Sequence, residues 1–386
     1  MFVKSVKLTN FRNYESLFIA FTSKNNILYG ENAQGKTNIL EAIFLCATGR
    51  SHRTSKDTEL IRFSTENAAV ELILEKPDFG EIKIAVEVFE NGKKKIKVND
   101  ILMKRMGDIM GHLNCVIFSP EDLSIIKDEP QQRRRFLDMF ISQIRPAYFF
   151  DLQKYLGTMR QRNALLKQIR EERGRHIHNP SNLATLDAWD EQLAQTGSRI
   201  MGTRKYYIEK IAYSTERNHR SITAEKEVSE TKYMPSVKVT EAEFSQGVDA
   251  IRSRFLKCLE DSRETDISRT GTSYGPHRDE LCFFIDHKSV KLFGSQGQQR
   301  TVALALKMAQ VDIMKEETGD MPILLLDDVM SELDRERQEN LTQNMKETQI
   351  FMTGTEQYLF DGWAKEEAEE LSPHYFRVEN GTVQTR

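Results

Sequence analysis

The fold of this chain is decided by one stretch of sequence, Gly30-Glu31-Asn32-Ala33-Gln34-Gly35-Lys36-Thr37. It has the form G-x-x-x-x-G-K-T of a phosphate-binding P-loop. The apolar run Ile27–Tyr29 before it predicts a strand, and the apolar periodicity of residues 39–46 after it predicts a helix. A strand, a glycine-bearing turn and a helix N-terminus in this order turn backbone N–H groups toward a phosphate. The sequence therefore predicts an α/β nucleotide-binding domain.

The chemistry of this loop assigns roles to single residues. We expect Lys36 to reach the β- and γ-phosphates of ATP and the Thr37 hydroxyl to bind Mg²⁺. The alternative is a chance match in a glycine-bearing turn, and the flanking strand and helix argue against it. The other nucleotide contacts expected from the loop and the start of the helix are Gly30, Asn32, Ala33, Gln34, Gly35 and Asn38.

A second motif begins almost three hundred residues later. The apolar run Ile323–Leu326 is followed by Asp327 and Asp328, which is a Walker B pattern. A strand that is apolar at every position suits the middle of a parallel sheet, and ligands lie at the carboxyl edge of such sheets. We expect Asp327 to hold Mg²⁺ and Asp328 to polarise the attacking water as the catalytic base. Taken alone, the pattern also fits two surface aspartates after a core strand.

A third motif, Phe293–Arg300, precedes an expected helix at residues 301–315. Its serine, glycine and glutamine residues at a helix start form another phosphate-binding patch. One subunit cannot easily direct two such patches at a single γ-phosphate, whereas a second subunit can. Ser295, Gly297 and Gln298 are therefore expected to contact ATP across a homodimer, with Ser295 taking part in catalysis.

Composition places the chain among intracellular globular proteins. Of its 386 residues, 29% are charged and 39% hydrophobic, and no apolar run approaches the roughly 20 residues that span a bilayer. The N-terminal residues carry charges inside their apolar stretch and lack a signal-peptide core. The four cysteines are far apart, so neither a zinc site nor a disulfide framework is indicated: Cys46, Cys115, Cys258 and Cys282. We expect a cytoplasmic location without membrane contact.

Charge is unevenly distributed along the chain. The formal net charge is −3, yet residues 151–220 carry 13 Lys and Arg against 8 Asp and Glu, a net charge of +5 that leaves −8 elsewhere. A basic segment within an acidic protein indicates local contact with a polyanion, and a solvated helical face explains the same charges equally well. The candidate residues for such a contact, which the resemblance described below identifies as DNA-binding, are Arg160, Arg162, Lys167, Arg170, Arg204 and Lys205.

The chain divides into three parts by pattern. Residues 1 to about 118 alternate with period two and predict strands. From there to about residue 265 the pattern is helical, and the stretches 145–176 and 183–218 could pack as an antiparallel arm. Strand character resumes at Leu281–Ile285 and continues to the end. A helical segment is therefore inserted between the two halves of one nucleotide domain.

In its motifs the chain resembles the RecF family, the SMC-like ABC ATPases of bacterial recombinational repair. The segment 293–300 resembles the signature motif that closes over the γ-phosphate of the opposite protomer, and Ser331–Asp334 resembles the D-loop. The resemblance spans nearly the whole chain in the family's order, with these stretches: Leu8–Tyr14, the P-loop with Thr37–Ile43, Phe118–Leu123, Arg133–Asp138, Gly275–Asp279, Ser295–Arg300, and Leu326–Val329 with Ser331–Asp334.

This resemblance implies an ABC-type ATPase head, formed by residues 1–118 and 275–386, with an inserted helical arm domain at 119–274. It also implies a weak DNA-dependent ATPase that dimerises on ATP and binds double-stranded and gapped DNA. Slow hydrolysis would release this clamp, and RecO and RecR would be its partners in loading RecA at single-strand gaps. The resemblance further places Arg12 and Arg53 near the nucleotide, with Arg50 as a competitor of Arg53.

Several positions depart from the cassette-ATPase pattern. The catalytic carboxylate is Asp328, where transporters of this class carry Glu, and a shorter base is compatible with slow turnover. No histidine follows the strand 349–352, so Thr353 or Thr355 would take the place of the switch histidine. No glutamine follows the strand 115–118, and the chemistry of the Pro276–Arg278 segment is not derivable from sequence.

Two functions of different class follow. The first is a DNA clamp, an ATPase that uses the nucleotide to control its binding to DNA. The second is a cassette ATPase that serves a protein assembly without DNA contact. The basic arm and the Asn10-Phe11-Arg12 pattern shared with SMC-like proteins favour the first.

Overall fold

The computed structural model describes residues 1–77, 79–177, 179–330, 338, 348–356 and 373–385. The chain forms two compact units. Unit 1 comprises Met1–Leu123, Arg217–Glu227 and Gln299–Arg386, and unit 2 comprises Ser124–Glu216 and Val228–Gln298. Residues 275–298 thus group with the helices of unit 2, while 119–123 and 217–227 group with unit 1. The head and arm boundaries expected from the sequence stay a prediction.

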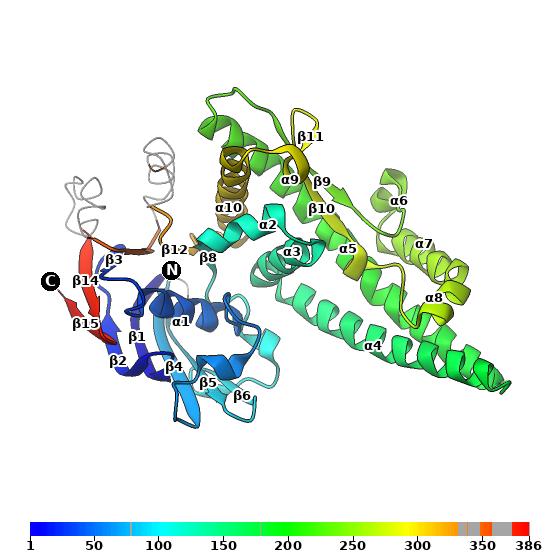
Figure 1. Cartoon of the computed structure of the whole chain (residues 1–386), viewed down its shortest axis with the longest axis horizontal. Coiled ribbons are helices and arrows are strands. Elements are labelled where there is room, and N and C mark those ends of the chain that lie inside the picture. Colours follow the sequence, from blue (N-terminus) through cyan, green and yellow to red (C-terminus); the bar gives the residue numbers. More distant parts are fainter. Residues whose placement is uncertain (78, 178, 331–337, 339–347, 357–372, 386) are drawn as a thin grey trace. The chain divides into compact units, whose positions relative to one another are not determined.

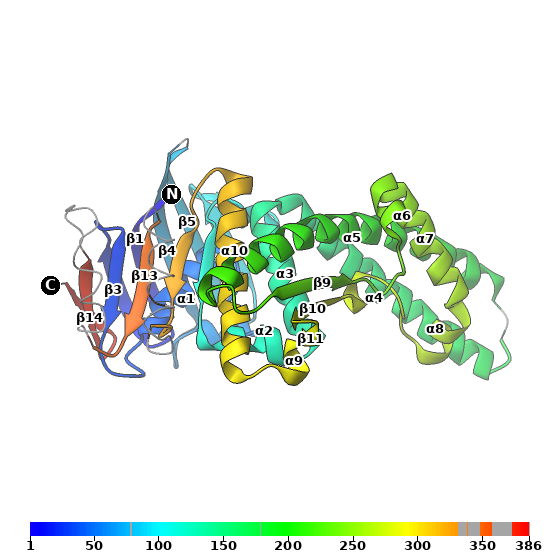
Figure 2. The same ribbon diagram turned by 90° about the horizontal axis from the view of Figure 1, so that it is seen from above.

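Unit 1 contains the sheet that carries the P-loop (Figures 1 and 2). Its inner strands are parallel, as expected for an α/β nucleotide domain, and β14(His374–Glu379) pairs with β15(Thr382–Thr385) antiparallel. Every residue of β12(Ile323–Leu326) is buried, in keeping with its place between β13(Ile350–Gly354) and β8(Cys115–Phe118). The strand order is β15(Thr382–Thr385), β14(His374–Glu379), β3(Asn25–Tyr29), β13(Ile350–Gly354), β12(Ile323–Leu326) and β8(Cys115–Phe118).

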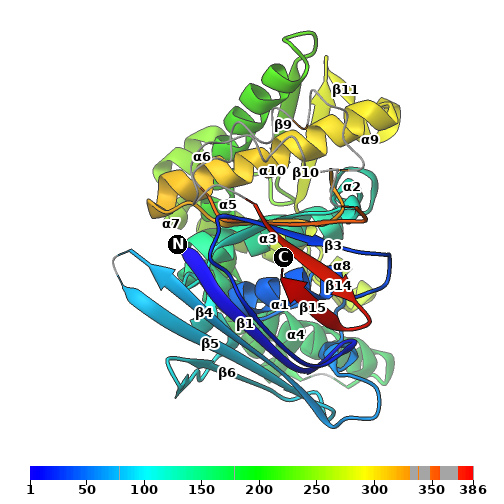
Figure 3. The same ribbon diagram turned by 90° about the vertical axis from the view of Figure 1, so that its left-hand side faces the viewer.

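A second sheet of unit 1 is antiparallel, and its strands alternate buried and exposed residues because one face packs on the core. Helix α1(Lys36–Thr48) lies between the two sheets (Figure 3), which explains why apolar and small residues surround almost its whole circumference. The strand order of this sheet is β2(Tyr14–Ala20), β1(Phe2–Phe11), β4(Asn67–Lys76), β5(Gly80–Phe89), β6(Lys94–Val98) and β7(Ile101–Leu102).

Further elements of the described chain are two helices and several 3-10 turns. Helix α10(Gln296–Thr318) buries most of its residues beyond Gln299. Helix α2(Leu123–Lys127) follows β8, as the sequence predicted, after a short turn. The 3-10 turns are η1(Asp57–Leu60), η2(Met106–Ile109), η3(Pro120–Asp122) and, in unit 2, η4(Pro276–Arg278).

Unit 2 is mainly helical, and its two longest helices, α4(Pro146–Gly174) and α5(Pro180–Ile222), lie side by side (Figure 1). Side-chain contacts run in opposite directions along them: Arg199 pairs with Asp151, Arg162 with Asp190, and Asn182 bonds to Glu172. This confirms the predicted antiparallel pair. The other helices are α3(Pro130–Ile144), α6(Glu241–Gln246), α7(Val248–Asp261), α8(Arg263–Arg269) and α9(Val290–Phe293).

Unit 2 also contains a small antiparallel sheet with the order β11(Lys288–Ser289), β10(Glu280–Ile285) and β9(Ser229–Met234). The sequence pattern predicted helix at β9, and this was wrong, because pairing with β10 overrides the local pattern. The strand at 281–285 was predicted correctly, but it pairs within unit 2 and does not extend the sheet of the P-loop.

Candidate nucleotide site

The P-loop joins β3 to α1 through two glycines that no other residue can replace. Gly30 has φ of 150°, and a Cβ there would lie 2.3 Å from the carbonyl oxygen of Val378. Gly35 has φ of 112°, and its Cβ would lie 2.6 Å from the Asn13 side chain. Both positions therefore need a residue without a side chain. Asn32 and Ala33 lie exposed on the loop between them.

Lys36 is the first residue of α1, and its ammonium folds over the loop. Nζ donates to the carbonyl oxygens of Gly30, at 2.5 Å, and Glu31, at 2.8 Å. Burial lowers the pKa of Lys36 from its usual value, and the charges of Asp328 and Asp327 oppose that shift. The ammonium therefore lies over the loop that the sequence predicts to bind phosphate.

The Walker B strand brings its carboxylates to this cradle. The Thr37 hydroxyl donates to Oδ1 of Asp327 at 2.7 Å, which joins two residues 290 positions apart. Burial raises the pKa of Asp327, and the hydrogen bonds from Thr37 and Thr353 counteract this shift. The predicted P-loop and Walker B residues thus meet at the carboxyl edge of the parallel sheet, where the sequence placed them.

These residues fit Mg²⁺. A hydroxyl oxygen and a carboxylate lie side by side, and Mg²⁺ prefers oxygen ligands, of which the protein supplies one or two while phosphate and water supply the rest. The described residues contain no group of three or more His, Cys, Asp and Glu that could hold a metal ion. Thr37 and Asp327 would hold the ion, which would supply positive charge to neutralise the phosphates.

Thr353, one of two candidates for the switch position, contacts the Walker B residues directly. Its hydroxyl donates to Oδ1 of Asp327 at 2.8 Å and accepts from the backbone N–H of Asp328 at 2.9 Å. Thr355 lies exposed beyond the end of β13. The role of γ-phosphate sensor stays a prediction for either residue.

The two predicted arginines lie on one side of α1, around the fully buried Glu41. Arg12 forms a bidentate pair with Glu41, with Nε–Oε2 and Nη2–Oε1 distances of 2.9 and 2.7 Å. Burial raises the pKa of Glu41, but hydrogen bonds from Arg12 and Ser51 outweigh it, so this pKa lies below its usual value. Arg53 donates to the Asn38 side chain at 3.0 Å and lies 3.8 Å from Glu41. Arg50 lies exposed just beyond the end of α1.

Sequence reasoning missed a support on the outer side of the P-loop. Asn13 donates to the carbonyl oxygen of Gln34 at 2.9 Å and accepts from the Asn38 amide at 2.8 Å. Tyr14 donates to the carbonyl oxygen of Gly35 at 3.1 Å. Asn13 and Tyr14 directly follow Arg12 within a stretch that the family resemblance included, and this was the available signal.

A second support comes from the other end of the chain. The backbone N–H of Asn380, in the turn between β14 and β15, donates to Oε1 of Gln34 at 2.6 Å. Asn380-Gly381 has the sequence of an ordinary hairpin turn, so nothing local in the sequence indicated that it meets the P-loop.

The signature segment begins α10 and lies in unit 2 up to Gln298. The N–H of Ser295 donates to the Gln298 side chain at 2.9 Å, and the N–H of Gln298 donates to the Ser295 hydroxyl at 3.2 Å. This reciprocal pair is a capping box, so two of the predicted ATP contacts also define a helix start. Gly297 lies between them. The predicted D-loop, Ser331–Asp334, lies outside the described residues.

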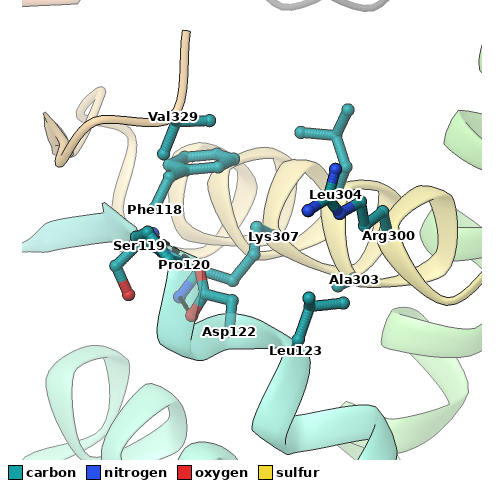
Figure 4. A pocket seen from close by; sticks show the side chains of 10 residues that line it. All are labelled: Phe118, Ser119, Pro120, Asp122, Leu123, Arg300, Ala303, Leu304, Lys307 and Val329. Carbon is teal, nitrogen blue, oxygen red and sulfur yellow. Dashed lines mark hydrogen bonds and ion pairs between the residues drawn. The ribbon is translucent and has the colours of Figure 1, made fainter. Parts of the chain in front are cut away.

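The segment after β8, where a glutamine was expected and is absent, borders an apolar pocket (Figure 4). The pocket lies between this segment and α10, and Lys307 pairs with Asp122 at 3.2 Å beside it. The N–H of Asp327 donates to the carbonyl oxygen of Phe118 at 2.8 Å, so the segment starts next to the Walker B carboxylate.

The six candidate DNA-binding residues do not share one environment. Arg160, Lys167 and Arg170 are exposed on α4. Lys205 is half-buried and pairs with Glu241 at 2.7 Å and Glu209 at 3.1 Å.

Two of the six predictions were wrong, because Arg162 and Arg204 are buried, with side chains 0% and 1% exposed. Arg162 pairs with Asp190 and Asp266, and Arg204 pairs with Asp138 and Asp279. A guanidinium enclosed by carboxylates in this way holds helices together and does not reach a phosphate.

His277, whose role the sequence left open, is enclosed in unit 2. Its Nδ1 lies 2.7 Å from the Tyr155 hydroxyl, and its Nε2 lies 3.0 Å from the carbonyl oxygen of Thr272. A neutral imidazole that donates from Nε2 and accepts at Nδ1 satisfies both contacts. Burial lowers the pKa of His277 to about 4, which agrees with that neutral form.

No helix in the described part of the chain is long and apolar enough to cross a membrane.

Comparisons with known proteins agree with this geometry. Residues 2–369 match the model of the RecF/RecN/SMC N terminal domain. The chain is 45% identical over 362 residues to the DNA replication and repair protein RecF of Acetivibrio thermocellus, covering 94% of this chain and 95% of the relative. It is 40% identical over 386 residues to RecF of Clostridium perfringens, with 100% of both chains covered.

Solved structures lead to the same group. A structure of the recombination mediator protein RecF with ATP in the RecFOR pathway matches with a TM-score of 0.90 and 38% identity, covering 100% of this chain and 97% of that one. An Smc head domain from Pyrococcus furiosus matches with a TM-score of 0.54 at 14% identity, which shows a likeness of fold alone. The expected fold class, an α/β head of the ABC and SMC type with a helical part, is confirmed. The chain therefore belongs to the RecF family, within the wider group defined by the RecF/RecN/SMC N terminal domain.

Proposed function

We propose that this protein is an ATP-dependent DNA clamp of recombinational repair and replication. ATP with Mg²⁺ joins two copies of the chain, the dimer binds double-stranded DNA at or beside a gap, and slow hydrolysis releases it. The names of the relatives support a role in DNA repair and replication. They are DNA replication and repair proteins, and one solved relative is a recombination mediator with ATP.

One observation carries the proposal most directly. The hydrogen bond between Thr37 and Asp327 assembles a P-loop and a Walker B strand into one site from opposite ends of the chain. Such a site binds a nucleoside triphosphate with Mg²⁺, and the neighbouring Asp328 is suited to accept a proton from an attacking water.

Within this proposal each residue has a physical task. Lys36 exchanges its two carbonyl partners for phosphate oxygens, a change that charge-assisted hydrogen bonds favour. Thr37 and Asp327 hold the metal ion. Ser295, at the start of α10, acts on the nucleotide of the other copy, and the capping box with Gln298 gives that helix start a fixed shape.

The DNA contact of this proposal lies on α4. Arg160, Lys167 and Arg170 are exposed and spaced by seven and three residues, which places them on one side of the helix. Contacts of this kind go to the phosphate backbone and read shape more than sequence. Lys205 is a weaker candidate, because two glutamates already engage its ammonium.

The partners of the proposal follow from the pathway of the relatives. The solved relative is described as part of the RecFOR pathway, and we propose that RecO and RecR act with this chain to load RecA at single-strand gaps. The alternative, a cassette ATPase that serves a protein assembly without DNA contact, receives no support from these relatives.

A gel-shift experiment with purified protein tests the proposal. We expect duplex and gapped DNA to be shifted in the presence of ATP and Mg²⁺, less with ADP, and with affinity that falls as salt rises. ATP binding and hydrolysis without any nucleotide-dependent DNA shift would favour the alternative. Absence of ATP binding would refute both.

A further inference from the structure

The end of the Walker B strand has an unusual hydrogen-bond arrangement. The ladder between β12 and β13 ends where Leu326 faces Met352. Beyond it, the N–H of Asp327 still bonds to β8, through the carbonyl oxygen of Phe118. The N–H of Asp328 instead bonds to a side chain, the Thr353 hydroxyl, at 2.9 Å. A hydroxyl therefore takes the place of the next backbone partner on β13.

The orientation of this hydroxyl is fixed on both sides. Thr353 is 2% exposed, and its single proton is donated to Oδ1 of Asp327 at 2.8 Å. Its oxygen accepts the Asp328 N–H at the same time. One side chain on β13 thus connects the expected metal-binding carboxylate to the backbone of the expected base.

The backbone of Asp328 needs such a restraint. Its φ is 53°, in the left-handed region that few residues other than glycine adopt, although Asp and Asn tolerate it better than most. This conformation ends the extended path of β12 and sets the direction in which the Asp328 side chain leaves the strand. Holding the N–H holds that direction.

We propose that Thr353 is a positioning residue for hydrolysis, which fixes the left-handed conformation of Asp328 and so aims its carboxylate at the attacking water. The inference rests on the proposed function, because the base role of Asp328 belongs to it. This positioning role differs from the γ-phosphate sensing predicted for Thr353 or Thr355, because it acts through the hydrogen bonds of Thr353 to Asp327 and Asp328.

The test compares one replacement of Thr353 that keeps the side-chain volume with another that keeps the hydroxyl group. Thr353→Val removes both hydrogen bonds at nearly constant size, and we expect kcat for ATP to fall by about 10- to 100-fold, because small errors in the placement of a catalytic group cost this much. KM for ATP should change less than kcat, since the Lys36 contacts are untouched and Asp327 keeps its hydrogen bond from Thr37. Thr353→Ser should restore most of kcat, because it retains the hydroxyl.

The chain supplies a matched control at the opposite end of the same strand pair. Thr348 is also 2% exposed, and its hydroxyl donates to the carbonyl oxygen of Pro322, just before β12. Thr348→Val therefore removes a buried hydroxyl between the same two strands but away from the carboxyl edge. We expect it to lower thermal stability about as much as Thr353→Val while leaving kcat unchanged.

A second measurement, which does not depend on ATP hydrolysis, tests whether Thr353 restrains the backbone of Asp328. Hydrogen exchange of the Asp328 N–H, followed by NMR on nucleotide-free protein labelled at aspartate nitrogens, should be at least tenfold faster in Thr353→Val than in the wild type, Thr353→Ser or Thr348→Val. Unchanged exchange, or a wild-type kcat in Thr353→Val, would overturn the inference. If the wild type hydrolyses no ATP, the proposed function fails, and the exchange rates still decide whether Thr353 holds Asp328.

Discussion

At the scale of single residues, Lys36 gives the most direct test of the nucleotide hypothesis. Its ammonium bonds to two loop carbonyls, and the residue is buried. We expect Lys36→Ala to weaken ATP binding by roughly 10- to 100-fold, the range for losing a charge-assisted hydrogen bond. Lys36→Arg should not restore binding, because a planar guanidinium does not fit a cradle shaped around a compact ammonium. Titration with a fluorescent ATP analogue measures both, and unaltered affinity in Lys36→Ala would refute the P-loop assignment.

Asp328 allows a second experiment at this scale. Asp328→Asn removes the base but keeps a residue type that tolerates the left-handed conformation with φ of 53°. ATP and Mg²⁺ binding should persist, because Asp327 remains, while hydrolysis should slow by about 10²- to 10⁴-fold. Single-turnover kinetics at saturating ATP measure this loss. Turnover at the wild-type rate would assign water activation to another group.

At the scale of elements, α4 carries the expected DNA contact. Replacing Arg160, Lys167 and Arg170 together by Ala should lower affinity for duplex DNA, and each phosphate interaction that the replacement removes should reduce the salt slope by about one. Arg173→Ala is the control, because Arg173 lies further round the same helix and pairs with Glu264 at 2.7 Å. An unchanged slope in the triple variant would move the DNA site away from α4.

The contact of His277, in η4, with Tyr155, in α4, predicts that the stability of the protein depends on pH. The pKa of His277 is lowered to about 4 in the folded chain, against an ordinary value of 6.5. Between these two pH values the unfolded chain binds a proton that the folded chain does not, so stability falls as pH drops from about 6.5 to 4. The full loss is about 3 kcal/mol for this group. His52, whose pKa burial lowers to about 4 as well, adds a loss in the same direction.

Urea unfolding at a series of pH values separates these contributions. His277→Gln should flatten part of the decline below pH 6.5, because Gln carries no titrating proton there. A decline as steep in His277→Gln as in the wild type would mean that His277 does not stay neutral in the folded chain.

At the scale of the whole molecule, the signature segment decides assembly. If Ser295 acts on the nucleotide of a second copy, Ser295→Arg should leave ATP binding by the monomer intact and abolish ATP-induced dimerisation and most hydrolysis. Bulk and charge would occupy the place of the γ-phosphate. Sedimentation with ATP and Mg²⁺ measures the dimer, and Ser245→Arg, at an exposed serine of α6, controls for added charge. A normal ATP-dependent dimer of Ser295→Arg would contradict action across the interface.

Those parts of the site that depend on local pattern could be predicted from the amino-acid sequence. The P-loop, the apolar Walker B strand and the helix after Gly35 are each coded by adjacent residues, because turns, strands and helix starts have short-range requirements. It was also predictable that the P-loop and the Walker B carboxylates come together, since parallel strands present their carboxyl ends at one edge of the sheet. The family resemblance added Arg12 and Arg53, whose local sequence carries no phosphate motif.

The partners of the buried polar side chains could not be predicted from sequence, because packing between distant elements sets them. Arg162 and Arg204 were predicted to contact DNA at the surface, yet carboxylates from other parts of the chain enclose them, because burial depends on packing between elements and not on local composition. The contact of Asn380 with Gln34 likewise joins residues 346 positions apart. Thr353 could be named from sequence as a candidate, but its two hydrogen bonds to the Walker B pair exist only because β12 and β13 lie side by side in this register.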